Sequence, residues 1–142
     1  MRKMLAILVV VLLTTGLSGA AVAEISTYEE PQIQLRYDHT TSIKAALSID
    51  GSGNATCSGS VKAVAGSGAV SVAVRLKKLE NGKWNTIATW SNSGTGSATV
   101  EASGSKKVPK GYSYKVVTSG TVKDAQGNVL ESPSKSSETK TY

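Results

Sequence analysis

The chain has few of the residues on which covalent cross-links, metal centres and catalytic sets depend. Its 142 residues include one cysteine, Cys57, one histidine, His39, three prolines and no phenylalanine. An internal disulfide needs two cysteines, and a zinc site needs three or four Cys, His or carboxylate ligands, so we expect neither. The core must therefore consist mainly of Val, Ile, Leu and Ala, with Trp and Tyr as the only large aromatic residues.

Catalytic chemistry has little support in the sequence. Asp38 and His39 are adjacent, so on a strand their side chains would point to opposite faces, and no serine lies in a nucleophile-elbow glycine pattern. A pair of Cys57 with His39 is no better supported, because nothing near Cys57 would lower the pKa of its thiol. We expect a protein that is not an enzyme, with no catalytic residues.

One segment has part of the spacing of a calcium loop. Asp50, Ser52 and Asn54 occupy positions one, three and five, but Ala55 stands where glycine is required and Val61 where a bidentate Glu belongs. A turn between strands explains the segment better. No glycine-rich phosphate loop precedes a helix, so we expect no metal, nucleotide or other cofactor.

The first 23 residues have the pattern of a secretory signal peptide. Arg2 and Lys3 precede an apolar stretch over residues 5–13, and a small-x-small cleavage site over residues 21–23 precedes Glu24. The pattern predicts a leader helix at 1–23 and a secreted, extracellular protein. The apolar stretch is too short to span a bilayer stably, and we expect no transmembrane segment after cleavage.

The rest of the chain is long enough for one domain. We expect a flexible lead-in at 24–31 and a single domain at 32–142. Without Arg2 and Lys3 the net charge is +4, a mild excess that favours anionic surfaces but is too small to indicate nucleic acid. The oligomeric state stays open.

Apolar and polar residues alternate with a period of two along this domain, and no helical period competes. Seven or eight short segments separated by Gly, Ser and Asn turns predict an all-β, antiparallel β-sandwich. The predicted strands lie at 33–37, 43–49, 54–63, 70–77, 84–91, 98–102, 112–119 and from 129 onward, with turns that include 93–96.

Two segments resemble the immunoglobulin and fibronectin type III superfamily. Residues 55–61 resemble its B strand and residues 108–116 its F strand. The resemblance implies an Ig-like sandwich in which Tyr112 forms the tyrosine corner and Tyr114 stands where the second disulfide cysteine would be, so that the disulfide is absent.

The order of several short motifs also resembles a group of small exported proteins from Gram-positive, clostridium-like bacteria. The resemblance covers roughly residues 33–131, and the group is of uncharacterised function, so it implies a fold and no activity. The motifs are Leu47-Ser48-Ile49, Ala55-Thr56-Cys57, Gly82-Lys83-Trp84 with Ile87 and Trp90-Ser91, and Gly111-Tyr112.

The two tryptophans are the best candidates for a binding site, and their exposure depends on one hairpin. A two-residue Asn81-Gly82 loop pairs Leu76 with Ile87 and places Trp84 and Trp90 on the outer face beside Arg75 and Lys77. A three-residue loop pairs Leu76 with Ala88, which would bury both tryptophans. The Asn-Gly pair favours the first register, although large aromatic residues more often serve to cover or fill a core.

Three functions remain open. The first is a non-enzymatic secreted module that recognises the surface of a protein or an envelope component. The second is binding of a carbohydrate or an anionic cell-wall polymer by Trp84, Trp90, Arg75 and Lys77. The third is a structural or fibre subunit, in which the strand at 33–37 completes a neighbouring sheet.

Overall fold

A computed structural model describes residues 37–142, which form one compact unit. The leader predicted at 1–23, the lead-in at 24–31 and most of the strand predicted at 33–37 lie outside the described residues. Tyr37, the last residue of that predicted strand, precedes the first observed strand. Within residues 37–142 no helix is long and apolar enough to cross a membrane.

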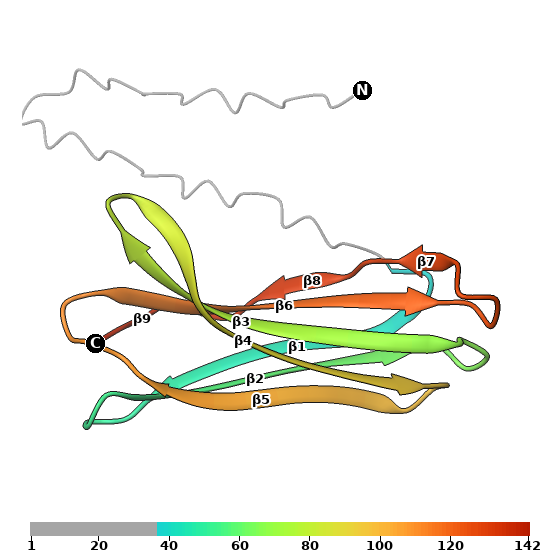
Figure 1. Ribbon diagram of the computed structural model, residues 1–142, viewed down its shortest axis with the longest axis horizontal. Coiled ribbons are helices and arrows are strands. Elements are labelled where there is room, and N and C mark those ends of the chain that lie inside the picture. Colours follow the sequence, from blue (N-terminus) through green and yellow to red (C-terminus); the bar gives the residue numbers. More distant parts are fainter. Residues whose placement is uncertain (1–36) are drawn as a thin grey trace, which may run out of the picture. The chain divides into compact units, whose positions relative to one another are not determined.

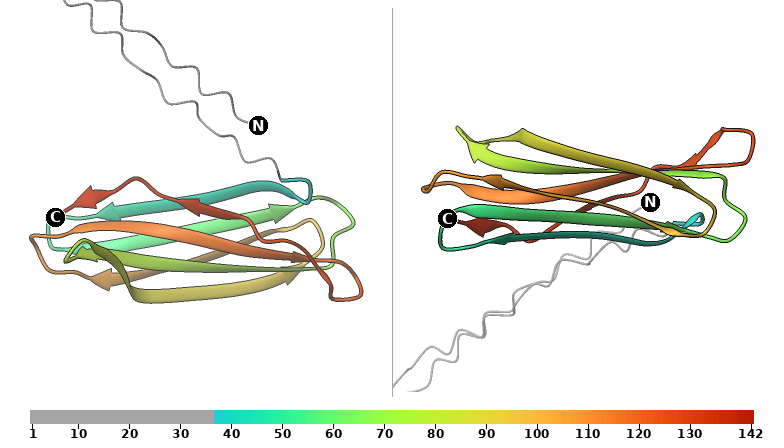
Figure 2. Two further views of the ribbon diagram at one scale, coloured as in Figure 1. Left: turned by 90° about the horizontal axis from the view of Figure 1, so that it is seen from above. Right: turned by 60° about the horizontal axis from the view of Figure 1, so that its bottom comes forward.

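The described residues form two antiparallel sheets that face one another (Figures 1 and 2). The three-stranded sheet has the order β1-β2-β5, with β1 at Thr40–Ile49, β2 at Asn54–Ala63 and β5 at Thr99–Lys107. The six-stranded sheet has the order β4-β3-β6-β7, and β8 and β9 also pair with β6. Its strands are β3 (Ala69–Glu80), β4 (Lys83–Thr95), β6 (Ser113–Lys123), β7 (Val129–Glu131), β8 (Ser134–Ser136) and β9 (Lys140–Thr141).

The prediction of an all-β antiparallel sandwich is therefore confirmed, but its strand count and one turn are not. The described chain has nine strands because the segment after residue 129 divides into three short ones along β6. Pro133, which has no N–H to donate, lies between β7 and β8. The turn predicted at 93–96 is also wrong at its start, because β4 continues to Thr95.

The core lies between the sheets and is made of alternate residues of β2, β3 and β6. Val70, Val72, Val74 and Leu76 point inward from β3, as their alternation predicts. The other sheet contributes mainly small side chains, which lets the two sheets lie close together. The buried residues of β2 and β5 in this core are Ala55, Cys57, Val61, Ala63, Val100 and Ala102.

Two glycines on the three-stranded sheet leave room for side chains from the opposite sheet. A Cβ at Gly59 would overlap the Thr118 hydroxyl, and a Cβ at Gly104 would overlap the indole of Trp90. Thr118 is fully buried in this space, and its hydroxyl has no hydrogen-bond partner. Close approach of a neighbouring group is the physical reason for glycine at both positions.

A fully buried tyrosine fixes the connection between β5 and β6, but it is not the expected one. Tyr114 donates a hydrogen bond of 2.6 Å to the backbone oxygen of Pro109, five residues upstream. The prediction that Tyr112 forms this corner is therefore wrong, because the tyrosine that makes the hydrogen bond stands two residues later in the chain. Tyr114 is fully buried in the core, and the half-buried ring of Tyr112 packs against the core with its centroid 3.8 Å from Lys78 Nζ.

The close approach at Gly104 predicts a cost for a single methyl group there. Gly104→Ala should destabilise the fold by about 1–3 kcal/mol, because the added Cβ must displace the Trp90 indole. Chemical denaturation gives the loss, and the tryptophan emission should shift at the same time. Gly51→Ala is the matched control, since its added Cβ meets nothing within 4 Å; equal stability of the two variants would contradict the contact.

The unpartnered hydroxyl of Thr118 predicts that its removal stabilises the fold. Thr118→Val keeps the shape of the side chain and removes a buried polar group, so it should raise the free energy of unfolding by about 1 kcal/mol. Thr56→Val, on an exposed outward position of β2, is the control. A loss of stability in Thr118→Val would show that the hydroxyl is satisfied.

Candidate functional site

The β3–β4 hairpin combines the two registers that the sequence allowed. At the tip, Asn81 and Gly82 have φ values of 52° and 75°, and Leu79 pairs with Trp84. The register then shifts by one residue at Ile87, and beyond this bulge Leu76 pairs with Ala88 and Val74 with Trp90. A bulge inserts one extra residue into one strand, so the two tryptophans lie on opposite faces of the sheet.

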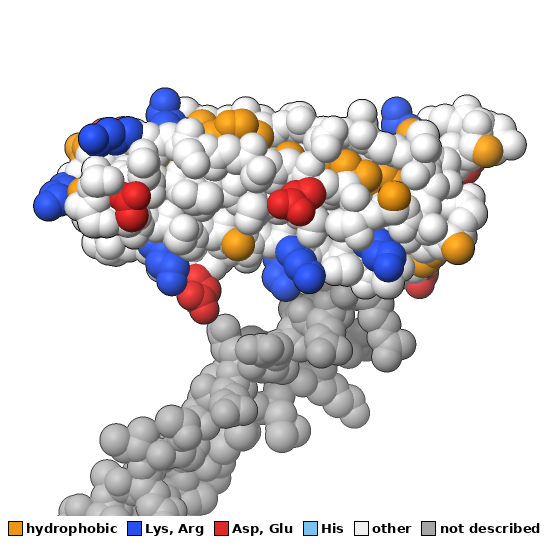
Figure 3. All heavy atoms as spheres, turned by 90° about the horizontal axis from the view of Figure 1, so that it is seen from below, with side chains coloured by type: hydrophobic (Ala, Val, Ile, Leu, Met, Phe, Trp, Pro, Cys, Tyr) orange, Lys and Arg blue, Asp and Glu red, His pale blue; other side chains and the backbone are white. Residues whose placement is uncertain are grey.

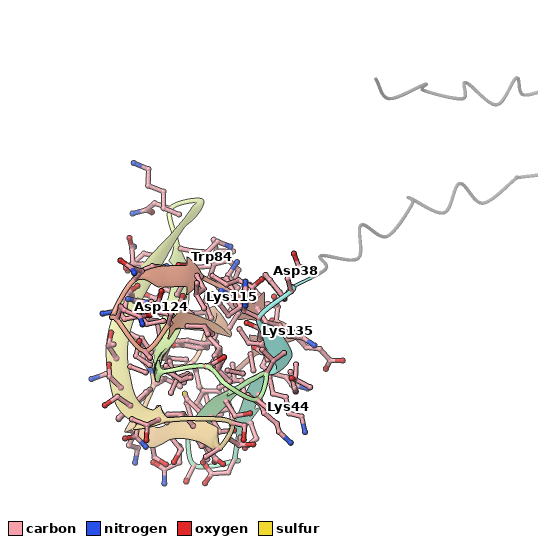
Figure 4. All side chains as sticks on the ribbon, turned by 90° about the vertical axis from the view of Figure 1, so that its right-hand side faces the viewer. Asp38, Lys44, Trp84, Lys115, Asp124 and Lys135 are labelled. Atoms are coloured by element: carbon pink, nitrogen blue, oxygen red, sulfur yellow. The ribbon has the colours of Figure 1, made fainter. Side chains whose placement is uncertain are left out.

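Trp84 lies on the outer face of the six-stranded sheet, as the two-residue turn predicts. Its half-buried ring is covered by a lysine from β6, the strand on the other side of β3, with Lys115 Nζ 4.4 Å from the ring centroid. Figure 4 shows these two side chains side by side. Lys77 is the direct sheet partner of Lys115 and points to the same face. Trp84, Lys115 and Lys77 together are called the aromatic–basic patch below.

Trp90 is not part of this patch. Its partner Val74 points into the core, and its indole lies over Gly104 of β5. The predicted exposed strip of both tryptophans is therefore wrong beyond the bulge. Lys115 was missed as a member of the patch, because the sequence predicts a strand at 112–119 but not that it lies beside β3.

Arg75 lies on the same outer face, beyond Lys77 along β3. Its Nη1 donates a hydrogen bond of 3.3 Å to Ser119 Oγ. The guanidinium lines an open hollow of about 540 Å³ in the sheet surface. Of the four predicted site residues, the structure thus places Arg75, Lys77 and Trp84 on one face and Trp90 on the other side of the sheet.

The aromatic–basic patch lies toward a basic end of the sandwich. The register brings to this end the β3–β4 tip, the end of β5, the start of β6 and β9 (Figure 1), and Figure 3 shows blue side chains gathered at its left. Two of the lysines form ion pairs, Lys78 with Glu80 and Lys140 with Glu138. The lysines of this end without an ion pair among the described residues are Lys77, Lys83, Lys106, Lys107, Lys110 and Lys115.

Cys57, Asp38 and His39, which the sequence analysis considered for catalysis, lie away from the aromatic–basic patch. Burial raises the pKa of the Cys57 thiol to about 11, so the thiol is protonated at neutral pH. The backbone N–H groups of Asp38 and His39 donate to the two carboxylate oxygens of Glu131. This contact ties the start of the described chain to β7.

Two turns share one pattern that the sequence shows as Asp-x-x-Gly-Asn. In the first, Asp50 Oδ1 accepts hydrogen bonds from the backbone N–H groups of Ser52 and Asn54 at 3.0 and 2.9 Å. In the second, Asp124 Oδ1 accepts those of Gln126 and Asn128 at 3.0 and 2.8 Å. The carboxylate of Asp50 thus organises a turn, which accounts for the oxygen spacing that resembled a calcium loop.

Comparison with known proteins finds only distant structural similarity. No family model and no curated protein matches the chain. Spo0M, a sporulation control protein from Bacillus subtilis, is similar with a TM-score of 0.46 and 13% identity over 71% of this chain. A candidate beta-galactosidase from Bacteroides fragilis is similar with a TM-score of 0.44 and 20% identity over 66%. The chain spans 48% and 15% of the lengths of these two structures.

The two Asp turns predict a loss of stability in acid. Hydrogen bonds, first that from the Asn54 backbone at Asp50 and that from the Asn128 side chain at Asp124, lower the pKa of both carboxyls below the usual 3.8. A carboxyl whose pKa is lower in the folded than in the unfolded state stabilises the fold above a pH of about 4. This stabilisation is lost as the pH falls through the pKa of the folded state. Urea midpoints measured from pH 6 to pH 2 should therefore fall.

The matched variants assign this loss to the turns. Asp50→Asn with Asp124→Asn should flatten the dependence on pH below about 4, while Glu101→Gln, at an exposed position of β5, should leave it unchanged. A double variant with the full acid dependence of the wild type would contradict the assignment.

Proposed function

We propose that this chain is an exported, non-enzymatic, fibronectin-III-like module that acts by surface recognition, and that the component it recognises is an anionic polymer of the cell envelope. The contact of Lys115 with the face of Trp84 on an open, basic sheet surface is the observation that carries the proposal. Export rests on the leader pattern of residues 1–23.

The order of the strands supports the finer fold. In an Ig-like sandwich strands ABED face strands CFG. The order β1-β2-β5 facing β3-β6 and its short edge strands parallels ABE facing CFG, with β4 added beside β3, and this order supports an Ig-like sandwich. Tyr114, two positions before Val116, makes the backward hydrogen bond typical of a tyrosine corner. Val116 then takes the position that the sequence resemblance gave to Tyr114.

The composition of the outer face supports an anionic ligand. The outward side chains of β3, β4 and β6 include Arg75, Lys77, Lys115 and Lys123 and no Asp or Glu. The Trp84 ring holds the Lys115 charge on this face beside Lys77, and these cations attract negative charge. The protonated, buried Cys57 leaves the described residues without an activated thiol, which supports recognition rather than catalysis.

Binding of a defined polyanion tests the proposal. The folded chain should bind polygalacturonate and polyphosphate more tightly than neutral dextran, and the affinity should fall as salt rises. Trp84→Ala and Lys115→Gln should each weaken binding about fivefold, corresponding to about 1 kcal/mol. Surface plasmon resonance on immobilised polymer measures both effects.

Lys62→Gln is the matched control, because Lys62 is exposed on the outer face of the other sheet. It removes the same charge and should leave the affinity within about twofold. Equal effects of the Lys62 and Lys115 variants, or equal binding of dextran, would remove the proposal.

A further inference from the structure

The hollow beside Arg75 is formed by a local change in side-chain size on the outer face. Around the middle of the sheet, β3, β4 and β6 carry small side chains in facing positions, with Ser91 and Ser119 on either side of Ala73. The next step along the strands places Ser93 and Thr121 on either side of Ser71. The result is an open depression of about 540 Å³, within the range of about 300–1,000 Å³ typical of small-molecule sites.

Arg75 supplies the only charged side chain of this hollow. The guanidinium has five N–H donors in a planar fork, and one of its nitrogens donates to Ser119 Oγ. No carboxylate lies within ion-pair distance of Arg75 among the described residues, where the ion pairs are Lys78–Glu80 and Lys140–Glu138. The arginine is thus half-buried, held at one nitrogen, and open to an external acceptor.

The remaining lining defines the rest of a ligand. Five hydroxyl groups line the hollow together with Arg75, and each can both donate and accept a hydrogen bond; they belong to Ser71, Ser91, Ser93, Ser119 and Thr121. Such a lining matches the hydroxyl groups of a sugar or polyol. One guanidinium matches one negative charge, which favours a carboxylate or a phosphodiester over a doubly charged phosphate monoester.

We propose that this hollow binds one unit of a polyhydroxylated anion, with a singly charged oxyanion on the Arg75 fork and the hydroxyl groups of the unit on the serine and threonine lining. The inference deepens the proposed function and rests on it for the biological source of the ligand. Lys77 lies two residues from Arg75 on β3, about 7 Å along the strand, so a polymer that follows the strand contacts both the hollow and the aromatic–basic patch.

Titration with small ligands tests the hollow apart from the patch. Methyl galacturonoside carries the carboxylate, glycerophosphoglycerol carries the phosphodiester, and methyl galactoside is the neutral reference. Added to the isotope-labelled chain, the two anions should shift the amide resonances of Ser91, Ser119 and Thr121, and the neutral sugar should not. Whichever anion binds more tightly identifies the oxyanion, and a galactoside that binds as tightly as both would overturn the proposal.

Variants of Arg75 test whether the guanidinium binds the anion. Arg75→Gln should weaken anion binding about tenfold or more, and Arg75→Lys, which keeps the charge but loses the fork, should also weaken it by severalfold. Lys62→Gln should bind as the wild type does. Wild-type affinity in Arg75→Gln, with unchanged thermal unfolding, would overturn the site.

The two proposals fail separately. If small anions leave the hollow unshifted while Trp84→Ala still weakens polymer binding, the hollow is wrong and the patch stands. If Arg75→Gln abolishes binding of the small anions while Trp84→Ala and Lys115→Gln bind polymer as the wild type does, the patch is wrong and the hollow stands.

Discussion

One inserted residue determines which surface this protein presents. The bulge at Ile87 shifts the pairing of β3 with β4 by one position, so side chains before and after it change faces relative to an uninterrupted strand. Trp84 therefore lies outside beside Lys115, while Trp90 lies inside over Gly104. Without the bulge the hairpin would have a single register, and both tryptophans would lie on the same face. Either Trp90 would then leave the core or Trp84 would leave the surface.

The interior is adapted to close sheets rather than to large side chains. The chain has no phenylalanine, its single cysteine is a free, buried thiol, and glycines stand opposite Thr118 and Trp90. Small residues on the three-stranded sheet let side chains of the other sheet extend into it, so contact area comes from proximity. The same preference for small side chains continues on the outer face, where it produces the hollow beside Arg75.

The sequence was sufficient for what depends on period and local turn chemistry. Alternation located the core face of β3, and Asn81-Gly82 identified the two-residue turn. What it could not supply depends on pairing between distant strands. The bulge at Ile87 has no local marker such as glycine, and the position of Lys115 beside Trp84 follows only from β6 lying next to β3. Similarly, Tyr112 and Tyr114 are two residues apart and both pack against the core, so alternation alone could not tell which hydroxyl reaches back to Pro109.

The division of the two tryptophans between opposite faces is the central claim, and nuclear Overhauser contacts of their indole N–H protons test it most directly. The account predicts contacts from the Trp90 indole to the α protons of Gly104, and from the Trp84 ring to the side chain of Lys115. Contacts of both indoles with residues of one face, whether Lys77 and Lys115 outside or the core inside, would contradict it.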